Sequence, residues 1–319
     1  MDVDREACRR VGKAISKLRV REDPFTDPSQ YPPAGEPAEW VARYFIFMVA
    51  IDHRTHPPGG VYEAELDGRV YRGASLLYRL GAEAYLMDRG FFSPEHMAKV
   101  TGREVERWLS RQGAKVSRPD ERAELLRDVA EGLLELYGGR ALKLVEESRS
   151  RLYAPWKGLV ERLKLFRAYM DPVEKKPFLL VKFLERRGLF RAEDRWRLQV
   201  PVDNHLTRVA VRAGIVKPSE GELELLEQRR EAEVEEDVAI RAAVRLAWRL
   251  VSMEAGLSPL LLDDLLWLIG KTLCRAEPSC DLPADLPAGS GGCPLREACA
   301  VYHELAEPLL EHRFTTYWY

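Results

Sequence analysis

The chain has 319 residues, of which 46% are hydrophobic and 31% are charged. This is enough apolar material for one large domain or two ordinary ones. The formal net charge is only −2, so the total charge does not indicate a strongly basic duplex-binding protein, although a local basic face is still possible. The polar start argues against a signal peptide, and no apolar run approaches the roughly 18 residues of a membrane span. We therefore expect a cytoplasmic protein with no membrane partner.

The predicted elements are mostly helical, with one exception near the N-terminus. Residues 20–38 are rich in Pro, Asp and Ser and predict an ordered loop. Residues 61–71 alternate apolar and polar side chains around Asp67-Gly68, which predicts a short β-hairpin. Apolar residues recur at helical spacing over 125–136, and the glycine pair that follows predicts the end of that helix.

The second half of the chain continues the helical pattern. Residues 217–236 are dominated by Glu and predict a solvated helix face, and residues 238–253 have apolar residues at a period of 3.6. We expect a mostly α-helical, two-lobed fold with a small N-terminal hairpin and a C-terminal cysteine loop. The expected segments are an N-terminal lobe over 1–120, a central helical lobe over 121–256 and a C-terminal segment over 257–319.

Four of the five cysteines lie within 26 residues near the C-terminus. They are Cys274, Cys280, Cys293 and Cys299. In a reducing compartment such clusters indicate metal, and four thiolates complete the ligand set of an iron–sulfur cluster or a structural zinc. A disulfide pair or free thiols are the alternative. Within the loop, residues 281–292 predict a flexible insertion, and a short helix is expected over 299–310.

Asp203 is the candidate catalytic residue. The segment Val200-Pro201-Val202 enters a predicted helix, which places Asp203 at or near its N-cap. A carboxylate there accepts backbone N–H bonds, and the positive end of the helix favours its charged form. Such a group suits stabilising an oxocarbenium-like centre or activating water. The alternative is an ordinary capping residue.

The pattern Val202-Asp203-x-His205-x-x-Arg208-Val209, followed by Gly270 and the cysteine loop, resembles endonuclease III. The relatives of that enzyme are DNA glycosylases of the helix-hairpin-helix superfamily. The resemblance implies that Asp203 is catalytic and that the four cysteines hold a [4Fe-4S] cluster, with structural zinc as the alternative. The middle of the loop departs from the family pattern, because a Pro- and Gly-containing stretch separates its second and third cysteines.

The DNA-gripping hairpin of that family carries a Gly-x-Gly turn before a helix. The corresponding residues here, 171–177, contain no glycine. Lys175 or Lys176 stands near the place where the glycosylase/lyase members have a Schiff-base lysine. The alternative for each is an ordinary surface lysine.

A second resemblance covers more of the chain. The order of segments is similar to that of the queuosine-salvage family, nucleosidases that release queuine from queuosine 5′-phosphate and share the glycosylase-like helical fold. The corresponding segments are 44–47 with 52–53, 71–77, 121–139, 166–171, 239–243 and 262–267. Asp203 falls where that family has its catalytic Asp, although its members generally lack the cysteine loop.

Other residues are candidates for binding substrate. Asp52 or His53 is placed to read a base edge, with a polar loop at a helix end as the alternative. Asp263 precedes Trp267 by one helical turn, so an acid and an indole share a face and together suit a nucleobase, unless they are a buried Trp and a capping Asp. His205 is expected to orient the helix start.

The predicted function is hydrolysis of an N-glycosidic bond with release of a nucleobase. A queuosine-type 7-deazaguanine nucleoside or nucleotide is the first substrate expected. A DNA base-excision glycosylase, with or without AP lyase activity, is the alternative, so the partner is either a nucleotide or DNA with a modified base. A third hypothesis is a non-enzymatic adaptor that binds nucleic acid or protein and whose metal only stabilises its fold. We expect a monomer.

Overall fold

The structure is a computed structural model that describes residues 1–111 and 113–319, with only the backbone described at Ser290. The chain divides into two compact units. Unit 1 comprises Met1–Asp23 and Leu198–Thr315, and unit 2 comprises Pro24–Arg197 and Thr316–Tyr319. Both chain ends therefore contribute to a unit built mainly from another part of the sequence. The expected boundaries at 120 and 256 fall inside these units rather than between them.

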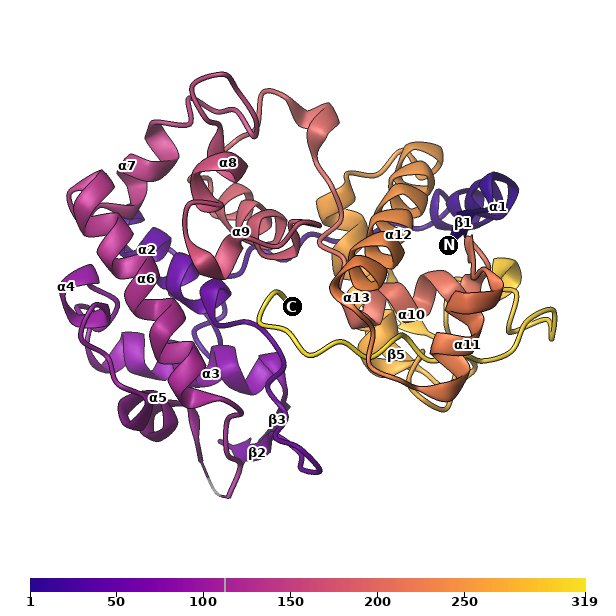
Figure 1. The fold of residues 1–319 in the computed structure, drawn as a ribbon, viewed down its shortest axis with the longest axis horizontal. Helices are drawn as coiled ribbons and strands as arrows, with labels where there is room; N and C mark the ends of the chain where they lie inside the picture. Colours follow the sequence, from indigo (N-terminus) through magenta and orange to yellow (C-terminus); the bar gives the residue numbers. More distant parts are fainter. Residues whose placement is uncertain (112) are drawn as a thin grey trace. The chain divides into compact units, whose positions relative to one another are not determined.

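Unit 2, drawn mainly in indigo to magenta in Figure 1, is mostly helical over its described residues and contains one two-stranded hairpin. Its elements are α2 (Ala38–Ala50), β2 (Glu63–Leu66), β3 (Arg69–Arg72), α3 (Ala74–Met87), α4 (Pro94–Met97), α5 (Gly102–Leu109), α6 (Pro119–Tyr137), α7 (Ala141–Glu146), α8 (Leu159–Leu163) and α9 (Lys175–Arg186), with 3-10 turns at Arg167–Tyr169 and Arg195–Arg197. The predicted hairpin is confirmed, with antiparallel pairing from Glu63↔Arg72 to Leu66↔Arg69. The predicted helix end is also confirmed, because Gly138 caps α6 with a φ of 61°.

Unit 1 contains the remaining elements. They are β1 (Asp2–Val3), α1 (Arg5–Ile15), α10 (Asn204–Ala213), β4 (Val216–Lys217), α11 (Glu220–Gln228), α12 (Val234–Ala255), α13 (Pro259–Thr272), β5 (Ala284–Leu286) and β6 (Gly289–Gly291), with a 3-10 turn at Arg296–Ala298. The mostly α-helical fold class is therefore confirmed. Two local predictions are wrong: the 281–292 insertion folds into the β5–β6 hairpin, and residues 299–310 form turns rather than a helix.

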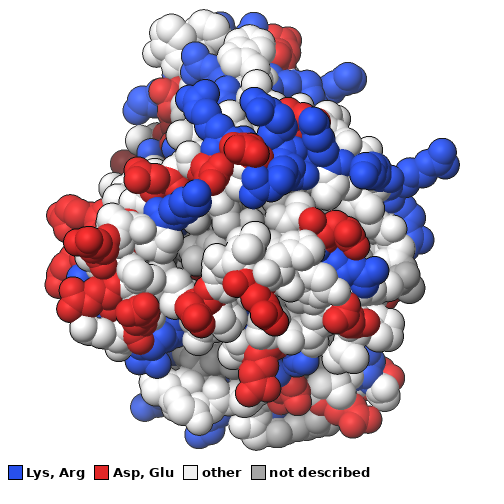
Figure 2. Space-filling view, turned by 90° about the vertical axis from the view of Figure 1, so that its right-hand side faces the viewer, with Lys and Arg blue, Asp and Glu red and all other residues white. Residues whose placement is uncertain are grey.

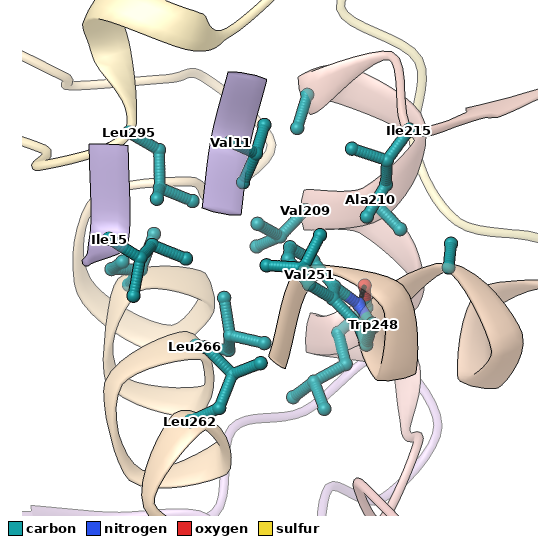
Figure 3. Close-up of a cluster of buried hydrophobic side chains, with 14 of the residues drawn as sticks. Val11, Ile15, Val209, Ala210, Ile215, Trp248, Val251, Leu262, Leu266 and Leu295 are labelled. Carbon is teal, nitrogen blue, oxygen red and sulfur yellow. Dashed lines mark hydrogen bonds between the residues drawn. The ribbon is translucent and has the colours of Figure 1, made fainter. Parts of the chain in front are cut away.

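The core of unit 1 is built around Trp248 of α12, which is fully buried. Its indole Nε1 donates to the carbonyl oxygen of Leu206 at 3.1 Å, so α12 and α10 are joined by a polar contact inside an apolar core. Helices α1 and α13 complete this core, as Figure 3 shows. The labelled side chains are Val11, Ile15, Val209, Ala210, Ile215, Trp248, Val251, Leu262, Leu266 and Leu295.

The core of unit 2 surrounds helix α2, which is buried almost all round from Val41 to Ala50. Phe45 of α2 stacks on Phe183 of α9 with ring centroids 4.6 Å apart. The chain that leaves α2 is held by Arg122 of α6, a fully buried guanidinium that donates to the carbonyl oxygens of Ile51, His53 and Arg54. This positions the residues directly after α2.

Across the residues that the structure describes, no helix combines the length and the apolar character that crossing a bilayer requires.

Candidate functional site

Asp203 caps helix α10. The preceding Val200 and Val202 are buried, which holds the chain in an extended entry to the helix. The Asp203 side chain accepts a hydrogen bond from the backbone N–H of Leu206 at 3.0 Å. The predicted N-cap is therefore confirmed, and a half-buried carboxylate lies at the positive end of the α10 dipole.

His205 is fixed by its neighbours. Its Nδ1 accepts a hydrogen bond from Arg208 Nη2 at 2.9 Å, and its ring meets that of Trp267 edge to face, with centroids 6.1 Å apart. Arg208 also donates to the carbonyl oxygen of Gly270 at 2.8 Å and pairs with Glu311 at 2.6 Å. Burial lowers the pKa of His205, which favours the neutral imidazole. These contacts suit a residue that orients the start of α10.

Gly270 lets helix α13 approach His205 closely, and its replacement by Ala is expected to disturb this contact. A Cβ at position 270 would lie 2.6 Å from His205 Cβ and 3.2 Å from its Cα. Because one of these atoms is backbone, relief requires a shift of α10 against α13. We expect Gly270→Ala to lower the free energy of unfolding by about 1–3 kcal/mol.

Chemical denaturation measures this change, and Gly221→Ala is the matched control. Gly221 also lies in a helix but has no neighbouring atom within 4 Å of an added Cβ. The control should be neutral or stabilising by up to about 1 kcal/mol. Equal stability of the Gly270→Ala variant and the wild type would contradict the close packing of these two helices.

Asp263 and Trp267 both lie on α13. Asp263 is only 3% exposed, while Trp267 is partly buried. Lys271 Nζ lies 4.6 Å from the centroid of the Trp267 ring. The indole of Trp267 therefore contacts both Lys271 and His205, and these two contacts limit how much of the ring is free to stack on a nucleobase.

A second group of predicted residues lies in unit 2, around the loop that leaves α2. Lys175 Nζ lies 3.5 Å from Asp52 Oδ2 and donates to the Asp52 carbonyl oxygen at 3.2 Å. Tyr78 donates to Asp52 Oδ2 at 3.4 Å. All three residues are buried. The lysine and the aspartate compensate each other's charge at a site with little solvent.

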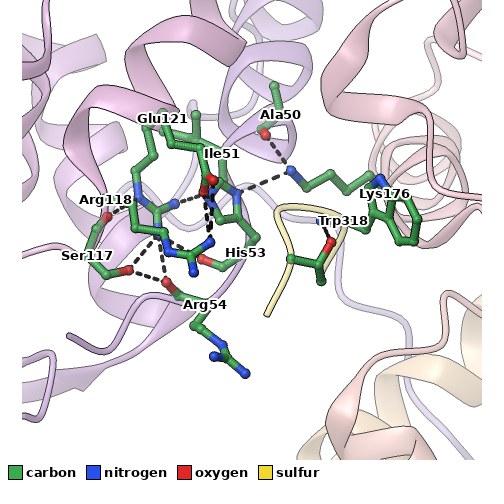
Figure 4. Close-up of polar contacts among 11 residues, drawn as sticks. Ala50, Ile51, His53, Arg54, Ser117, Arg118, Glu121, Lys176 and Trp318 are labelled. Carbon is green, nitrogen blue, oxygen red and sulfur yellow. Dashed lines mark hydrogen bonds and ion pairs between the residues drawn. The ribbon is translucent and has the colours of Figure 1, made fainter. Parts of the chain in front are cut away.

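Lys176 is fully buried beside this pair. Its Nζ donates to the carbonyl oxygen of Ala50 at 2.5 Å and lies 3.3 Å from His53 Nδ1. The other imidazole nitrogen, Nε2, lies 3.3 Å from Glu121 Oε1, so an amine, an imidazole and a carboxylate follow one another (Figure 4). Burial, reinforced by the charge of Lys175, lowers the pKa of Lys176 well below its usual value and favours a neutral amine.

The turn before α9 adopts a glycine-like conformation without glycine. Glu174, the N-cap residue, has a φ of 62°. Its carboxylate accepts hydrogen bonds from Tyr153 at 2.6 Å and Lys164 at 3.2 Å, which helps to hold a conformation that side chains rarely adopt. Buried Asp171 accepts from the backbone N–H of Lys175 at 2.7 Å. The sequence did not reveal that the helix start is built in this way.

The four loop cysteines all belong to unit 1, and Arg212 of α10 lies among them. Arg212 Nη1 is 3.6 Å from Cys274 Sγ, and the Cys299 thiol donates to the Arg212 carbonyl oxygen at 3.3 Å. A hydrogen bond from the Cys293 thiol lowers the pKa of Cys280 to about 7. The two ends of the loop therefore meet at Arg212, and its two middle cysteines contact each other.

These thiols fit a soft metal. Within the described residues, no three Cys, His, Asp or Glu side chains are gathered closely enough to hold a single metal ion. A zinc ion needs its sulfur ligands at roughly 2.3 Å from one centre. The thiolates that bind an iron–sulfur cluster are attached to different iron atoms and can stand further apart. Four thiols are the donor set of both an iron–sulfur cluster and a structural zinc, so their ligand chemistry fits either group.

The structure places the predicted site residues in two groups. Asp52, His53 and Lys176 come together in unit 2. The other group, in unit 1, consists of Asp203, His205, Asp263, Trp267 and the four loop cysteines. Sequence reasoning missed Glu121 as a neighbour of His53 and Arg212 as the centre of the cysteine loop. The sequence did offer a sign of the role of Arg212, because Arg208 and Arg212 are four residues apart on one face of an otherwise apolar helix.

Residues 187–282 match the model of a protein family described as AGOG, N-glycosylase/DNA lyase. The matched segment is less than a third of the chain. It contains Asp203, His205 and the α13 candidates, together with Cys274 and Cys280. It begins after Lys176 and ends before the last two loop cysteines.

Two solved structures are similar to this chain. The 8-oxoguanine DNA glycosylase Pa-AGOG from Pyrobaculum aerophilum, complexed with 8-oxoguanosine, is 17% identical over 85% of this chain and 90% of that chain, with a TM-score of 0.44. A thermostable thymine-DNA glycosylase is 13% identical over 94% of this chain and 97% of that chain, with a TM-score of 0.41. No curated protein matches the chain.

The family match bears on the predictions of function. It confirms the predicted enzyme class, an N-glycosylase, and agrees with the DNA-glycosylase alternative. The resemblance to the queuosine-salvage family finds no counterpart in these comparisons. The non-enzymatic adaptor hypothesis is not supported by the match.

Proposed function

We propose that this chain is a DNA N-glycosylase that excises a modified base. The observation that carries the proposal is the N-glycosylase/DNA lyase match over 187–282, because that segment includes the helix capped by Asp203. A capping carboxylate with buried apolar residues before it is held in a fixed position. That is the property a group must have in order to stabilise charge in a transition state.

In the proposed reaction Asp203 acts on the sugar. The bond between C1′ and the base nitrogen breaks, and the departing base takes the bonding electrons. The Asp203 carboxylate faces the positive charge that develops on the sugar. Water then adds to C1′ and gives up a proton, which the departed base takes up. His205 acts as a positioning residue, because its contacts with Arg208 and Trp267 hold the start of α10.

Lys176 is the residue that we propose for a lyase step. After base loss, the sugar opens to an aldehyde, and a neutral amine can attack that carbon to form an imine with loss of water. Lys176 suits this role better than Lys175, because burial favours its neutral form whereas Lys175 is paired with Asp52. His53 Nδ1 lies 3.3 Å from its Nζ, within reach of the departing proton.

Base release from defined duplexes tests the proposed function. Each duplex carries one modified or mispaired base, such as 8-oxoguanine or mispaired thymine, and a strand break after alkali reports the abasic site. We expect breaks at the modified position of at least one duplex and none in the undamaged control. An enzyme that leaves every duplex intact would overturn the assignment to DNA.

We also propose that Cys274, Cys280, Cys293 and Cys299 hold a [4Fe-4S] cluster that braces the C-terminal loop. The role is structural, since hydrolysis of a glycosidic bond needs no redox step. Protein purified without oxygen is expected to be brown and to contain iron and acid-labile sulfide. Replacing Cys293 with Ser should remove the colour and lower the melting temperature, while Cys8→Ser, at the buried cysteine outside the loop, should keep the colour. A colourless protein with one zinc per chain would contradict the cluster.

A further inference from the structure

The N-terminal segment carries a charge opposite to that of the rest of the chain. Residues 5–21 contain seven Lys or Arg and a single acidic residue, Glu6. The basic residues are Arg5, Arg9, Arg10, Lys13, Lys17, Arg19 and Arg21. Because the whole chain has a formal charge of −2, the other residues together carry −8. A nearly neutral total therefore conceals a concentrated basic segment.

Helix α1 presents four of these charges, Arg5, Arg9, Arg10 and Lys13, on one face. Its opposite face buries Ala7, Val11 and Ile15 in the core of unit 1, so the basic residues are directed outward. Gly12 brings α1 against α12 so closely that an added Cβ would lie 2.6 Å from Glu254 Cβ and 3.1 Å from the Val251 carbonyl oxygen. The exposed face is thus fixed in orientation, with cations at four-residue intervals of about 6 Å along the helix.

The chain after α1 continues the same surface. Leu18 and Val20 pack against the core, while Arg19 and Arg21 between and after them are exposed. The backbone N–H of Arg21 donates to the carbonyl oxygen of Pro287 at 2.9 Å, which anchors this arm. We call the exposed side chains of Arg5, Arg9, Arg10, Lys13, Lys17, Arg19 and Arg21 the α1 basic surface.

The charges of this surface are little compensated within the chain. Arg10 pairs with Glu6 at 3.6 Å, but both side chains are more than half exposed, so the pair contributes little. In the part of the chain that the structure describes, no ion pair involves Arg9, Lys13 or Arg19. Figure 2 views the face of the molecule on the α1 side of Figure 1 and shows Lys and Arg side chains gathered in its upper part.

We propose that the α1 basic surface is a docking surface for the phosphate backbone of duplex DNA. A row of fixed cations on a helix, with guanidinium groups in excess of ammonium groups, matches a regular line of phosphates and carries no base-reading geometry. Binding there is therefore independent of sequence and of damage. The inference rests on the proposed function for its choice of DNA as the polyanion, but it concerns a surface outside the catalytic candidates.

The salt dependence of binding to an undamaged duplex tests this surface. The variant Arg9→Gln, Arg10→Gln, Lys13→Gln, Lys17→Gln removes four cations while keeping helix-forming side chains. We expect the slope of log affinity against log salt to become shallower by about 2–4, since each lost phosphate contact removes about 0.9. A matched variant that neutralises the exposed Lys99, Arg103, Arg107 and Lys115 of unit 2 makes the same change in net charge, and its slope should change by less than one.

The outcomes separate this inference from the proposed function. A shallower slope in the α1 variant, with unchanged helicity and melting temperature, supports the surface even if no base is ever released. Equal slopes in the two variants overturn it, even if base release is normal. The proposal is also overturned if the α1 variant loses binding to anionic lipid vesicles or to single-stranded RNA but still binds duplex DNA as the wild type does. A direct readout is cross-linking of α1 to a duplex with photoreactive phosphates.

Discussion

Replacing Asp203 with Asn should reduce base release by about 100- to 1,000-fold, while the protein stays folded. Asn has nearly the same shape, and its side-chain oxygen can still accept the hydrogen bond from Leu206 N–H, so the cap of α10 is retained. The negative charge that faces the sugar is lost. Single-turnover excision assays, with the melting temperature as a check on folding, measure the two effects separately.

The same substitution at Asp4 is the matched control for Asp203. Asp4 caps α1 by accepting from the backbone N–H groups of Glu6 and Ala7, so it has the same local role in the same unit. Asp4→Asn should leave base release within a few-fold of the wild type. Turnover that survives in Asp203→Asn, or an equal loss in both variants, would show that Asp203 only caps its helix.

Replacing Lys176 with Met should abolish the covalent complex that borohydride traps between the protein and abasic DNA. Met keeps the length and apolar stem of the side chain but has no amine, so no imine can form. Lys175→Met removes the neighbouring amine instead and should leave trapping in place. If only Lys175→Met lost trapping, the reactive amine would be that of Lys175, and the proposal for Lys176 would be wrong.

The pH dependence of trapping keeps the Lys176 prediction testable even if the Met variant folds poorly. An ordinary lysine has a pKa of 10.5, and burial lowers the pKa of Lys176 well below that value. An amine is reactive when neutral, so its reactive fraction is complete above its own pKa and is lost as the pH falls through it. The wild-type trapping rate should therefore reach its plateau well below pH 10.5. A rate that keeps rising to that pH would indicate an exposed, unperturbed amine.

Local patterns predicted the parts of the site that depend on neighbouring residues. The buried Val-Pro-Val entry placed Asp203 at the N-cap, and alternating residues around Asp67-Gly68 placed the hairpin, because caps and tight turns are made by residues a few positions apart. The contact of Lys176 with His53 joins residues 123 positions apart. No local pattern specifies such a contact, so the burial of that lysine could not be predicted from the sequence.

Two features contradict the simplest local expectation, and both have a physical cause. The loop between Cys280 and Cys293 is rich in Pro and Gly, which predicts an irregular segment. Leu286 is nevertheless buried in the core of unit 1 and holds the β5–β6 hairpin against it. The turn before α9 lacks glycine, yet Glu174 adopts a positive φ with Tyr153 and Lys164 bound to its carboxylate. In each case a contact from elsewhere in the same unit overrides the preference of the local residues.

The central claim is that this chain cleaves N-glycosidic bonds in DNA, and mass spectrometry of released bases tests it most directly. The protein is incubated in parallel with a damaged duplex mixture and with queuosine 5′-phosphate, and the small molecules are separated from the reaction. The account predicts a free modified base from the duplexes and none from the nucleotide. Release of queuine from the nucleotide, with no base from any duplex, would contradict it.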